Sequence, residues 1–325
     1  MDNKRSILIT GGAGFIGFAL AKNLSKDNRN KIYIIDNLSR GSLDKEFKEL
    51  IKFKNIKFLK ADLTKKIRFN FKDLTHIFHL AGSVGVKNIN KDSFGSFFNN
   101  VETLKNIIKI CQNTNRKIKF ILFSTSEVYS NLIKNNKVKF PIKETNNIII
   151  ENNIIKRDAY FLSKIFNEKI IQLSNIKYLI LRPHNIYGPR MGLSHVIPEL
   201  IKKFSLEKNK KKLNTTVFSP SHKRAFCYID DAINQIKKLT FTKRSDNKIF
   251  NIGNMEEEIT MFNLAIKLKN LIYVKSKIKK GEDTLGSPIR RIPDMNNTLK
   301  ITKIKKLTSL NDGLKKTVNW YLKNK

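Results

Sequence analysis

Short apolar runs alternate with helical patterns through the first half of the chain. The runs are four or five residues long and rich in Ile, Leu and Phe, which is typical of buried strands. We predict strands over 6–10, 31–35, 56–59, 77–80, 119–123 and 178–181, and helices from the first glycine turn to residue 24, over 93–112 and over 158–174. Apolar strands between helices predict a parallel sheet with helices on both faces.

The pattern changes after Arg182-Pro183, where turn residues gather over 183–194. Helical and short extended segments are mixed beyond this point. We therefore predict a first domain over 1–181 and a smaller α/β domain over 182–325.

Two segments complicate this division. The run 250–252 looks like a strand, and we expect segments around 225–252 to return to the first domain. The stretch 131–153 is polar and rich in Asn, which predicts an irregular surface loop.

Composition permits a large core, since 40% of the 325 residues are hydrophobic. No apolar run approaches the roughly 18 residues that cross a bilayer, and no signal-peptide core follows the N-terminus. We therefore expect a cytoplasmic protein with no membrane span. Cys111 and Cys227 form no pattern, which favours two reduced thiols, and no cluster has metal-ligand spacing.

The net charge of +37 raises the possibility of nucleic-acid binding. The lysines, however, are scattered in short groups such as Lys202-Lys203 and Lys305-Lys306, without interleaved aromatic residues. This pattern favours solvated surface lysine over a specific nucleic-acid face. The resulting field attracts anionic ligands at low salt.

The run TGGAGFIG at 10–17 follows the first strand directly and opens a helix. Gly11, Gly14 and Gly17 permit a tight turn and a close approach of the backbone to a pyrophosphate. Together with Phe15 and Ile16, they predict the phosphate-binding turn of a Rossmann-type doubly wound sheet, with the helix N-terminus facing the phosphates.

The second strand ends at Asp36, which lies 19 residues after Gly17. A carboxylate at this position accepts hydrogen bonds from both ribose hydroxyls of an adenosine and repels the 2′-phosphate of NADP. We therefore predict NAD as the cofactor, with Asn37 beside it, although Arg40 is a cation that opposes this choice. Asp62, followed by Leu63, either holds the adenine or caps the next helix.

The catalytic candidates begin with Tyr160 and Lys164, which are four residues apart and so share one face of a helix. A neighbouring ammonium favours the phenolate, which can then take a proton from a sugar hydroxyl. The alternative is a chance pair on a helix surface. Thr125 and Glu127 follow the strand 119–123, at the end of a strand where open α/β sheets place ligands.

The chain resembles the extended short-chain dehydrogenases/reductases of the NAD-dependent epimerase/dehydratase family, which act on nucleotide sugars. The resemblance covers nearly the whole length and rests on TGGAGFIG (10–17), DNLSRG (36–41), IFHLAG (77–82), FSTSEVY (123–129), YFLSK (160–164), RPHNIYGPR (182–190), KRAFCYIDDA (223–232) and FNIGN (250–254).

The resemblance implies roles for further residues. Leu80 and Ala81, after His79, would line the nicotinamide, with Asn100 near the cofactor. A second set would bind the substrate together with Thr125, namely Asn185, Val196, Arg224 and Arg291. The helices 93–112 and 158–174 would pair with those of a second copy in a homodimer.

The sequence leaves the reaction open. Thr125-Ser126-Glu127 resembles the form found in UDP-glucuronate decarboxylases and some nucleotide-sugar dehydratases. The expected activity is epimerisation or dehydration through a 4-keto intermediate, with decarboxylation as the alternative. A non-catalytic relative that binds NAD or RNA is a more distant reading, against which the intact Thr125, Tyr160 and Lys164 argue.

Overall fold

The computed structural model describes residues 4–67, 69, 71, 73–83, 85–113, 117–135, 137–207, 214–284 and 286–324. The chain forms two compact units. Unit 1 consists of Met1–Val128, Ile150–Arg182 and Ile236–Phe250, and unit 2 consists of Tyr129–Ile149, Pro183–Gln235 and Asn251–Lys325. Each unit is described by itself below.

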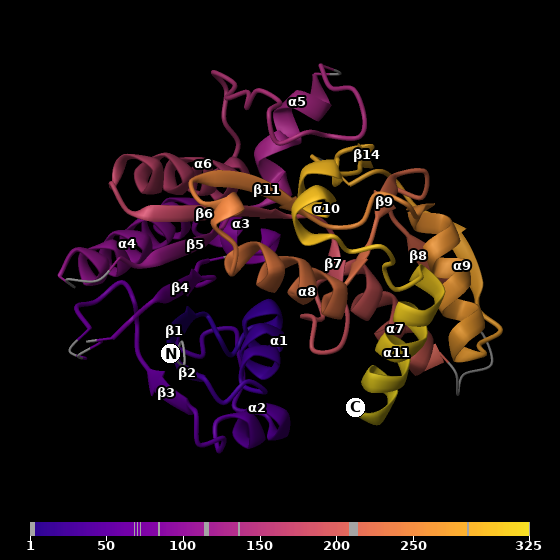
Figure 1. Cartoon of the computed structure of the whole chain (residues 1–325). Helices are drawn as coiled ribbons and strands as arrows, with labels where there is room; N and C mark the ends of the chain where they lie inside the picture. The colour runs from indigo at the N-terminus through magenta and orange to yellow at the C-terminus, as the bar shows by residue number, and fades with distance from the viewer. Residues whose placement is uncertain are drawn as a thin grey trace. The chain divides into compact units, whose positions relative to one another are not determined.

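Unit 1 is built on a seven-stranded sheet with the order β11-β6-β5-β4-β1-β2-β3 (Figure 1). The strands are β1 (Arg5–Thr10), β2 (Asn30–Asp36), β3 (Ile56–Lys60), β4 (His76–His79), β5 (Lys119–Phe123), β6 (Lys177–Pro183) and β11 (Lys248–Ile252). Neighbouring strands from β3 to β6 all pair in parallel. The prediction of a parallel, Rossmann-type sheet is therefore confirmed.

Helices cover both faces of this sheet. They are α1 (Phe15–Leu24), α2 (Lys45–Leu50), α3 (Val86–Lys91), α4 (Ser93–Gln112) and α6 (Asp158–Leu173), of which α4 and α6 pack against each other. Ile7, Leu8 and Ile9 point alternately to opposite faces of β1, yet each is fully buried. This burial on both faces explains why the strands read as continuous apolar runs.

Unit 2 is a mixture of helices and three small sheets, with orders β10-β7, β12-β9-β14 and β13-β8. Its strands are β7 (Ile186–Tyr187), β8 (Asn214–Val217), β9 (Lys223–Ala225), β10 (Cys227–Tyr228), β12 (Glu258–Thr260), β13 (Lys277–Lys280) and β14 (Arg290–Arg291). Its helices are α5 (Ser130–Lys134), α7 (Val196–Glu207), α9 (Met261–Ile272), α10 (Asn296–Thr302) and α11 (Leu310–Lys323). Helix α8 (Ile229–Thr240) begins in unit 2 and ends in unit 1.

The stretch 131–153 is only in part the surface loop that its composition predicts. It opens in α5, and Ile142 is fully buried. The backbone N–H of Ile142 donates to the carbonyl of Ile292 at 2.9 Å, and Glu144 Oε1 accepts from the N–H of Asn251 at 2.9 Å. Most polar residues of the stretch are exposed, as the composition predicts, whereas Glu144 is buried with a partner from a distant part of the chain.

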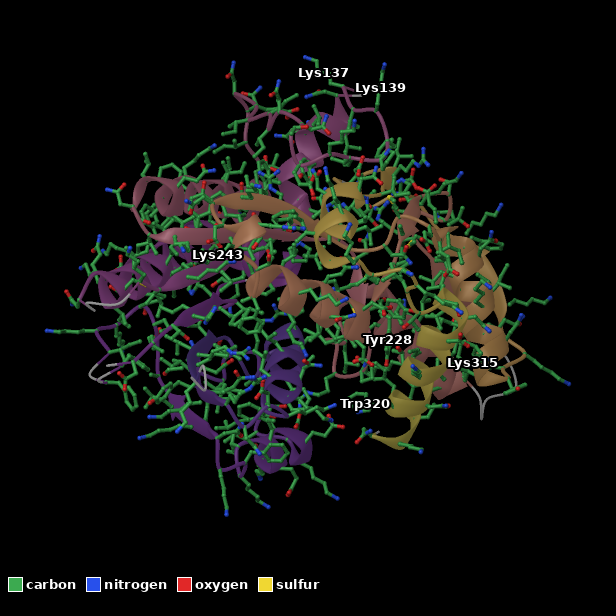
Figure 2. All side chains as sticks on the ribbon, viewed as in Figure 1. Lys137, Lys139, Tyr228, Lys243, Lys315 and Trp320 are labelled. Atoms are coloured by element: carbon green, nitrogen blue, oxygen red, sulfur yellow. The ribbon has the colours of Figure 1, made fainter. Side chains whose placement is uncertain are left out.

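The charge lies mostly on exposed lysines. Lys137, Lys139, Lys243 and Lys315 are exposed in the positions that Figure 2 labels. Lys119 is an exception, since it is buried and its Nζ lies 2.7 Å from Asp246 Oδ1. Among the described residues, no helix is both long and apolar enough to cross a membrane.

Candidate active site

The glycine turn joins β1 to α1 in a conformation that side chains would obstruct. Gly11 has φ +70°, and a Cβ added there would lie 2.9 Å from the backbone nitrogen of Ala81. A Cβ on Gly17 would lie 2.3 Å from the carbonyl oxygen of Gly11. Both glycines are therefore required by close backbone contacts.

The N-terminus of α1 fits a phosphate. Gly14 is its N-cap and contributes no side-chain hydrogen bond, so no capping side chain occupies the first amides. Phe15 and Ile16 form the first turn and are partly buried. The ten-residue helix thus presents the kind of N-terminus that binds phosphate in dinucleotide-binding turns.

Asp36 lies at the end of β2 and is almost buried. Its Oδ2 accepts a hydrogen bond from the N–H of Ala13 at 3.0 Å, and its Oδ1 accepts from the N–H of Leu38 at 2.8 Å. These bonds fix the carboxylate against the glycine turn. Each carboxylate oxygen can accept a second hydrogen bond, so Asp36 also fits a pair of ribose hydroxyls. The neighbouring Asn37 accepts from the N–H of Ser39 at 3.0 Å.

Asp62 and Leu63 follow β3 in a turn. Asp62 Oδ1 accepts from the N–H and the hydroxyl of Thr64, at 2.9 and 2.8 Å. Leu63 is buried in the apolar core, and its carbonyl accepts from Asn106 Nδ2 at 2.9 Å. Asp62 therefore stabilises a turn, and one of its two oxygens already has two partners.

The end of β4 is tied to β1 through Thr10. Thr10 Oγ1 lies 2.9 Å from His79 Nδ1 and accepts from the N–H of Ala81 at 3.2 Å. Burial lowers the pKa of His79 to about 3, and the charge on Lys164 contributes to this change. His79 is therefore neutral at physiological pH, and Thr10 fixes the backbone around Leu80.

Asn100, on α4, connects this strand end to the helix that carries the catalytic candidates. Its Nδ2 donates to Ser163 Oγ at 2.9 Å, and its Oδ1 accepts from the N–H of Ser83 at 2.6 Å. Asn167 Nδ2 donates to the Asn100 carbonyl at 3.1 Å. These bonds give Asn100 a structural role within unit 1.

Three of the predicted catalytic residues come together at the ends of β5 and α6. The side chain of Thr125 is hydrogen-bonded to Tyr160. Lys164 Nζ lies 5.9 Å from the centroid of the Tyr160 ring and donates to the carbonyl of Phe123 at 3.0 Å. The carbonyl holds the buried ammonium in place, so the pair is not a chance arrangement on a helix surface.

The electrostatics differ from the sequence-based expectation in one respect. Burial raises the pKa of Tyr160 well above its usual range, and the Glu127 carboxylate adds to the effect. The hydrogen bond from Thr125 and the charge on Arg40 act in the opposite direction. Burial also lowers the pKa of Lys164 to about 8, although Glu168 opposes this change. In the chain alone, burial therefore outweighs the cations that favour the phenolate.

Glu127 lies in the short 3₁₀ helix η1 (Ser126–Tyr129) that follows β5. Its N–H donates to Thr125 Oγ1 at 3.2 Å. Its Oε1 lies 3.6 Å from Nη2 of Arg157, the residue before α6. The sequence reasoning missed Arg157. The available signal was its position three residues before Tyr160, which places both side chains on one face of the helix.

The remaining predicted residues belong to unit 2. Asn185 has φ +41°, and its Nδ2 donates to the carbonyl of Ala225 at 3.1 Å. Val196 is the first residue of α7 and is partly buried. Both residues therefore lie in unit 2, Asn185 directly before β7 and Val196 at the start of α7.

Arg224 and Arg291 face each other in register on the neighbouring strands β9 and β14. Both are almost buried. Arg224 Nη2 donates to Ser287 Oγ at 2.9 Å, and its Nη1 donates to the carbonyl of Lys223 at 2.8 Å. Two buried cations side by side repel each other, so an anionic group between them would be favourable.

The sequence profile described as "NAD dependent epimerase/dehydratase family" matches residues 7–253. The chain belongs to this family. Membership confirms the predicted class of enzyme and its cofactor, NAD. The fit is visible in the chain itself, in the glycine turn, the α1 N-terminus and the carboxylate of Asp36.

Similar proteins carry out several different reactions. UDP-glucuronic acid decarboxylase 6 of Arabidopsis thaliana is 27% identical over 312 residues, which cover 95% of this chain and 86% of the relative. The dTDP-D-glucose 4,6-dehydratase of Dictyostelium discoideum is 32% identical over 292 residues, which cover 83% of this chain and 64% of the relative. The structure of a UDP-N-acetylglucosamine 4-epimerase from Methanobrevibacter ruminantium matches with a TM-score of 0.83 at 23% identity. The match covers 99% of this chain and 100% of the epimerase chain.

Proposed function

We propose that this enzyme oxidises a nucleotide-linked sugar at C4 and then acts on the resulting 4-keto sugar as an epimerase or dehydratase. The observation that carries the proposal is the cluster of Thr125, Tyr160 and Lys164, with Glu127 beside it. When bound, NAD would supply a hydride acceptor and a positive charge that favours the phenolate. Thr125 orients the reacting hydroxyl, and Tyr160 accepts its proton. Lys164, while protonated, stabilises the phenolate that this transfer requires.

The cofactor would be held by residues from four strand ends of unit 1, after β1, β2, β3 and β4, and by Asn100 of α4. The glycine turn with Phe15 and Ile16 would receive the pyrophosphate, and Asp36 with Asn37 the ribose. The remaining contacts would come from Asp62, Leu63, Leu80, Ala81 and Asn100. Asp62 and Asn100 would contact the cofactor through atoms next to those that already bind Thr64 and Ser163.

The substrate would be an anionic nucleotide diphosphate sugar. Arg224 and Arg291 support this proposal, because guanidinium groups in register match the geometry of phosphate or carboxylate oxygens. Asn185 and Val196 would complete the substrate contacts of unit 2. The scattered exposed lysines give no comparable indication of a nucleic-acid site.

Glu127 separates the possible reactions. A carboxylate that exchanges a proton beside the ketone is needed for dehydration, or for epimerisation at C3 or C5, but not for simple 4-epimerisation. Decarboxylation is the second candidate, because Thr125-Ser126-Glu127 resembles the form found in UDP-glucuronate decarboxylases and a decarboxylase is among the similar proteins. The sugar's C6 carboxylate would then be lost from the 4-keto stage.

The test is incubation with a panel of UDP-, GDP-, CDP- and dTDP-sugars, with products identified by mass spectrometry and NMR. Glu127→Gln should oxidise the sugar normally but accumulate NADH, seen by near-ultraviolet absorbance, and lose solvent-deuterium incorporation beside the ketone. Tyr160→Phe should instead slow the oxidation itself by about 10²–10⁴. Normal turnover of Glu127→Gln without trapped NADH would point to a plain 4-epimerase. Release of carbon dioxide from a uronate would establish the decarboxylase.

We also propose that the enzyme is a homodimer formed through α4 and α6. Phe94, Phe98 and Phe166 are exposed on these helices, and Phe97 links them, with its ring centroid 5.4 Å from that of Phe98 and 5.9 Å from that of Phe166. An aromatic patch of this kind is typical of a protein interface. Light scattering on the purified protein should give twice the chain mass of 37.7 kDa, and a monomer would contradict the proposal.

A further inference from the structure

A serine of unit 2 contacts one of the arginines proposed to bind the substrate. Ser287 Oγ accepts a hydrogen bond from Arg224 Nη2 at 2.9 Å and lies 3.2 Å from His222 Nδ1. Because an arginine only donates, the serine oxygen is the acceptor in the first contact, and its own hydrogen can be accepted by the histidine ring. His222 is buried, and its backbone N–H donates to the carbonyl of Ser219 at 3.0 Å. The Ser287 hydroxyl is therefore held between a buried ring and a guanidinium.

The guanidinium of Arg224 is fixed through both of its terminal nitrogens. Nη1 donates to the carbonyls of Lys223 and Ile289, at 2.8 and 3.4 Å, whereas Nη2 donates to Ser287. A guanidinium is rigid and planar, so bonds to both nitrogens define its plane as well as its position. Both carbonyls are backbone groups, so Ser287 is the contact that a side-chain substitution can remove.

We propose that Ser287 is a positioning residue that fixes Arg224 in the orientation that binds the diphosphate of the substrate. This inference rests on the proposed function, in which Arg224 and Arg291 bind an anionic nucleotide sugar. The two arginines are only 9% and 8% exposed, lie in register on neighbouring strands and repel each other. A neutral hydroxyl that holds one of them keeps the pair aligned before the anion arrives, and a preorganised site loses less entropy on binding.

A merely structural serine would instead anchor the segment that follows β13. That segment is already attached to the stretch before β9 by two bonds that do not involve Ser287. The N–H of Ser219 donates to the carbonyl of Glu282 at 3.0 Å, and the N–H of Thr284 donates to Ser219 Oγ at 2.9 Å. Loss of the Ser287 hydroxyl should therefore leave the segment attached and act on Arg224.

The experiment compares Ser287→Val with Ser287→Thr, two side chains of the same shape of which only Thr carries a hydroxyl. Residue 287 precedes a proline, which favours extended backbone, and branched side chains suit this conformation. UDP, GDP, CDP and dTDP are titrated by calorimetry into the full chain saturated with NAD, each beside its nucleoside, so that the difference reports the diphosphate. For the diphosphate that binds most tightly, Ser287→Val should weaken binding about tenfold and Ser287→Thr much less. The nucleoside should bind both variants equally.

Two controls separate this role from a general disturbance of unit 2. Ser219→Ala removes the oxygen that holds Thr284 and leaves the Arg224 contacts in place, so diphosphate binding should stay near the parent value. In the Arg224→Ala background, Ser287→Val should have no further effect, because residues that act through one another are not additive. With a sugar nucleotide that the enzyme turns over, Ser287→Val should raise KM far more than it lowers kcat.

The outcomes distinguish the role of Ser287 from the proposed function. Equal diphosphate affinities of Ser287→Val and Ser287→Thr would overturn the positioning role. A loss in Ser219→Ala as large as that in Ser287→Val would do the same, because it would show that attachment of the segment is what matters. If Arg224→Ala binds the diphosphate as tightly as the parent, or if none of the four diphosphates binds, the proposed substrate site is wrong and the role of Ser287 falls with it.

Discussion

The buried ion pair between Glu168 and Arg182 provides a test of both stability and catalysis. Arg182 Nε lies 2.9 Å from Glu168 Oε1 and Nη2 lies 2.6 Å from Oε2, with side chains only 3% and 1% exposed. This bidentate arrangement joins α6 to β6. Glu168 lies one helical turn after Lys164, so it also contributes to the charge at the proposed site.

Glu168→Gln keeps the shape of the side chain but leaves the Arg182 cation uncompensated in the interior. Removing one partner of a buried pair costs about 3–5 kcal/mol. The matched control is Glu102→Gln, which breaks the Lys105–Glu102 pair on α4, whose side chains are 51% and 38% exposed. Exposed pairs are worth about 0–1 kcal/mol. In urea unfolding, the loss of unfolding free energy relative to the parent should therefore be several times larger for Glu168→Gln than for Glu102→Gln.

The same substitution should alter the redox step. Glu168 opposes the effect of burial on the pKa of Lys164, which is about 8. Without this carboxylate the pKa falls further, and Lys164 loses its proton at a lower pH. Substrate-dependent NADH formation, which requires the ammonium, should then decline at lower pH than in the parent. If Glu168→Gln matches Glu102→Gln in stability and keeps the parent's alkaline limb, the reasoning about this buried pair is wrong.

Two further predictions concern the cofactor and acid stability. The parent should bind NAD at least tenfold more tightly than NADP, about 1.4 kcal/mol by calorimetry, whereas Asp36→Ala should lose this preference. Burial holds the pKa of His79 near 3, against 6.5 for a free histidine. Because the unfolded chain takes up this proton first, stability should fall by about 1.4 kcal/mol per pH unit between these values. In His79→Gln, the free energy of unfolding measured with urea should fall less between pH 7 and pH 5 than it does in the parent. An equal fall in both proteins would refute the assignment.

The features that local sequence determines were predictable. Strands such as β1 and β5 are continuous apolar runs because both their faces are buried, and Gly17 is required by a contact with Gly11 inside the same turn. The predicted helix over 93–112 matches α4, which begins after the capping residue Asp92, whose side chain accepts from the N–H of Gly95. Period and capping are both visible in a single segment.

The features that depend on distant segments were not predictable. Nothing near Glu168 in the sequence marks Arg182 as its partner. The 131–153 stretch has a polar composition, yet Glu144 is almost buried and holds the backbone of Asn251. The raised pKa of Tyr160 has the same origin, because sequence shows which charges are near but not how much water is excluded.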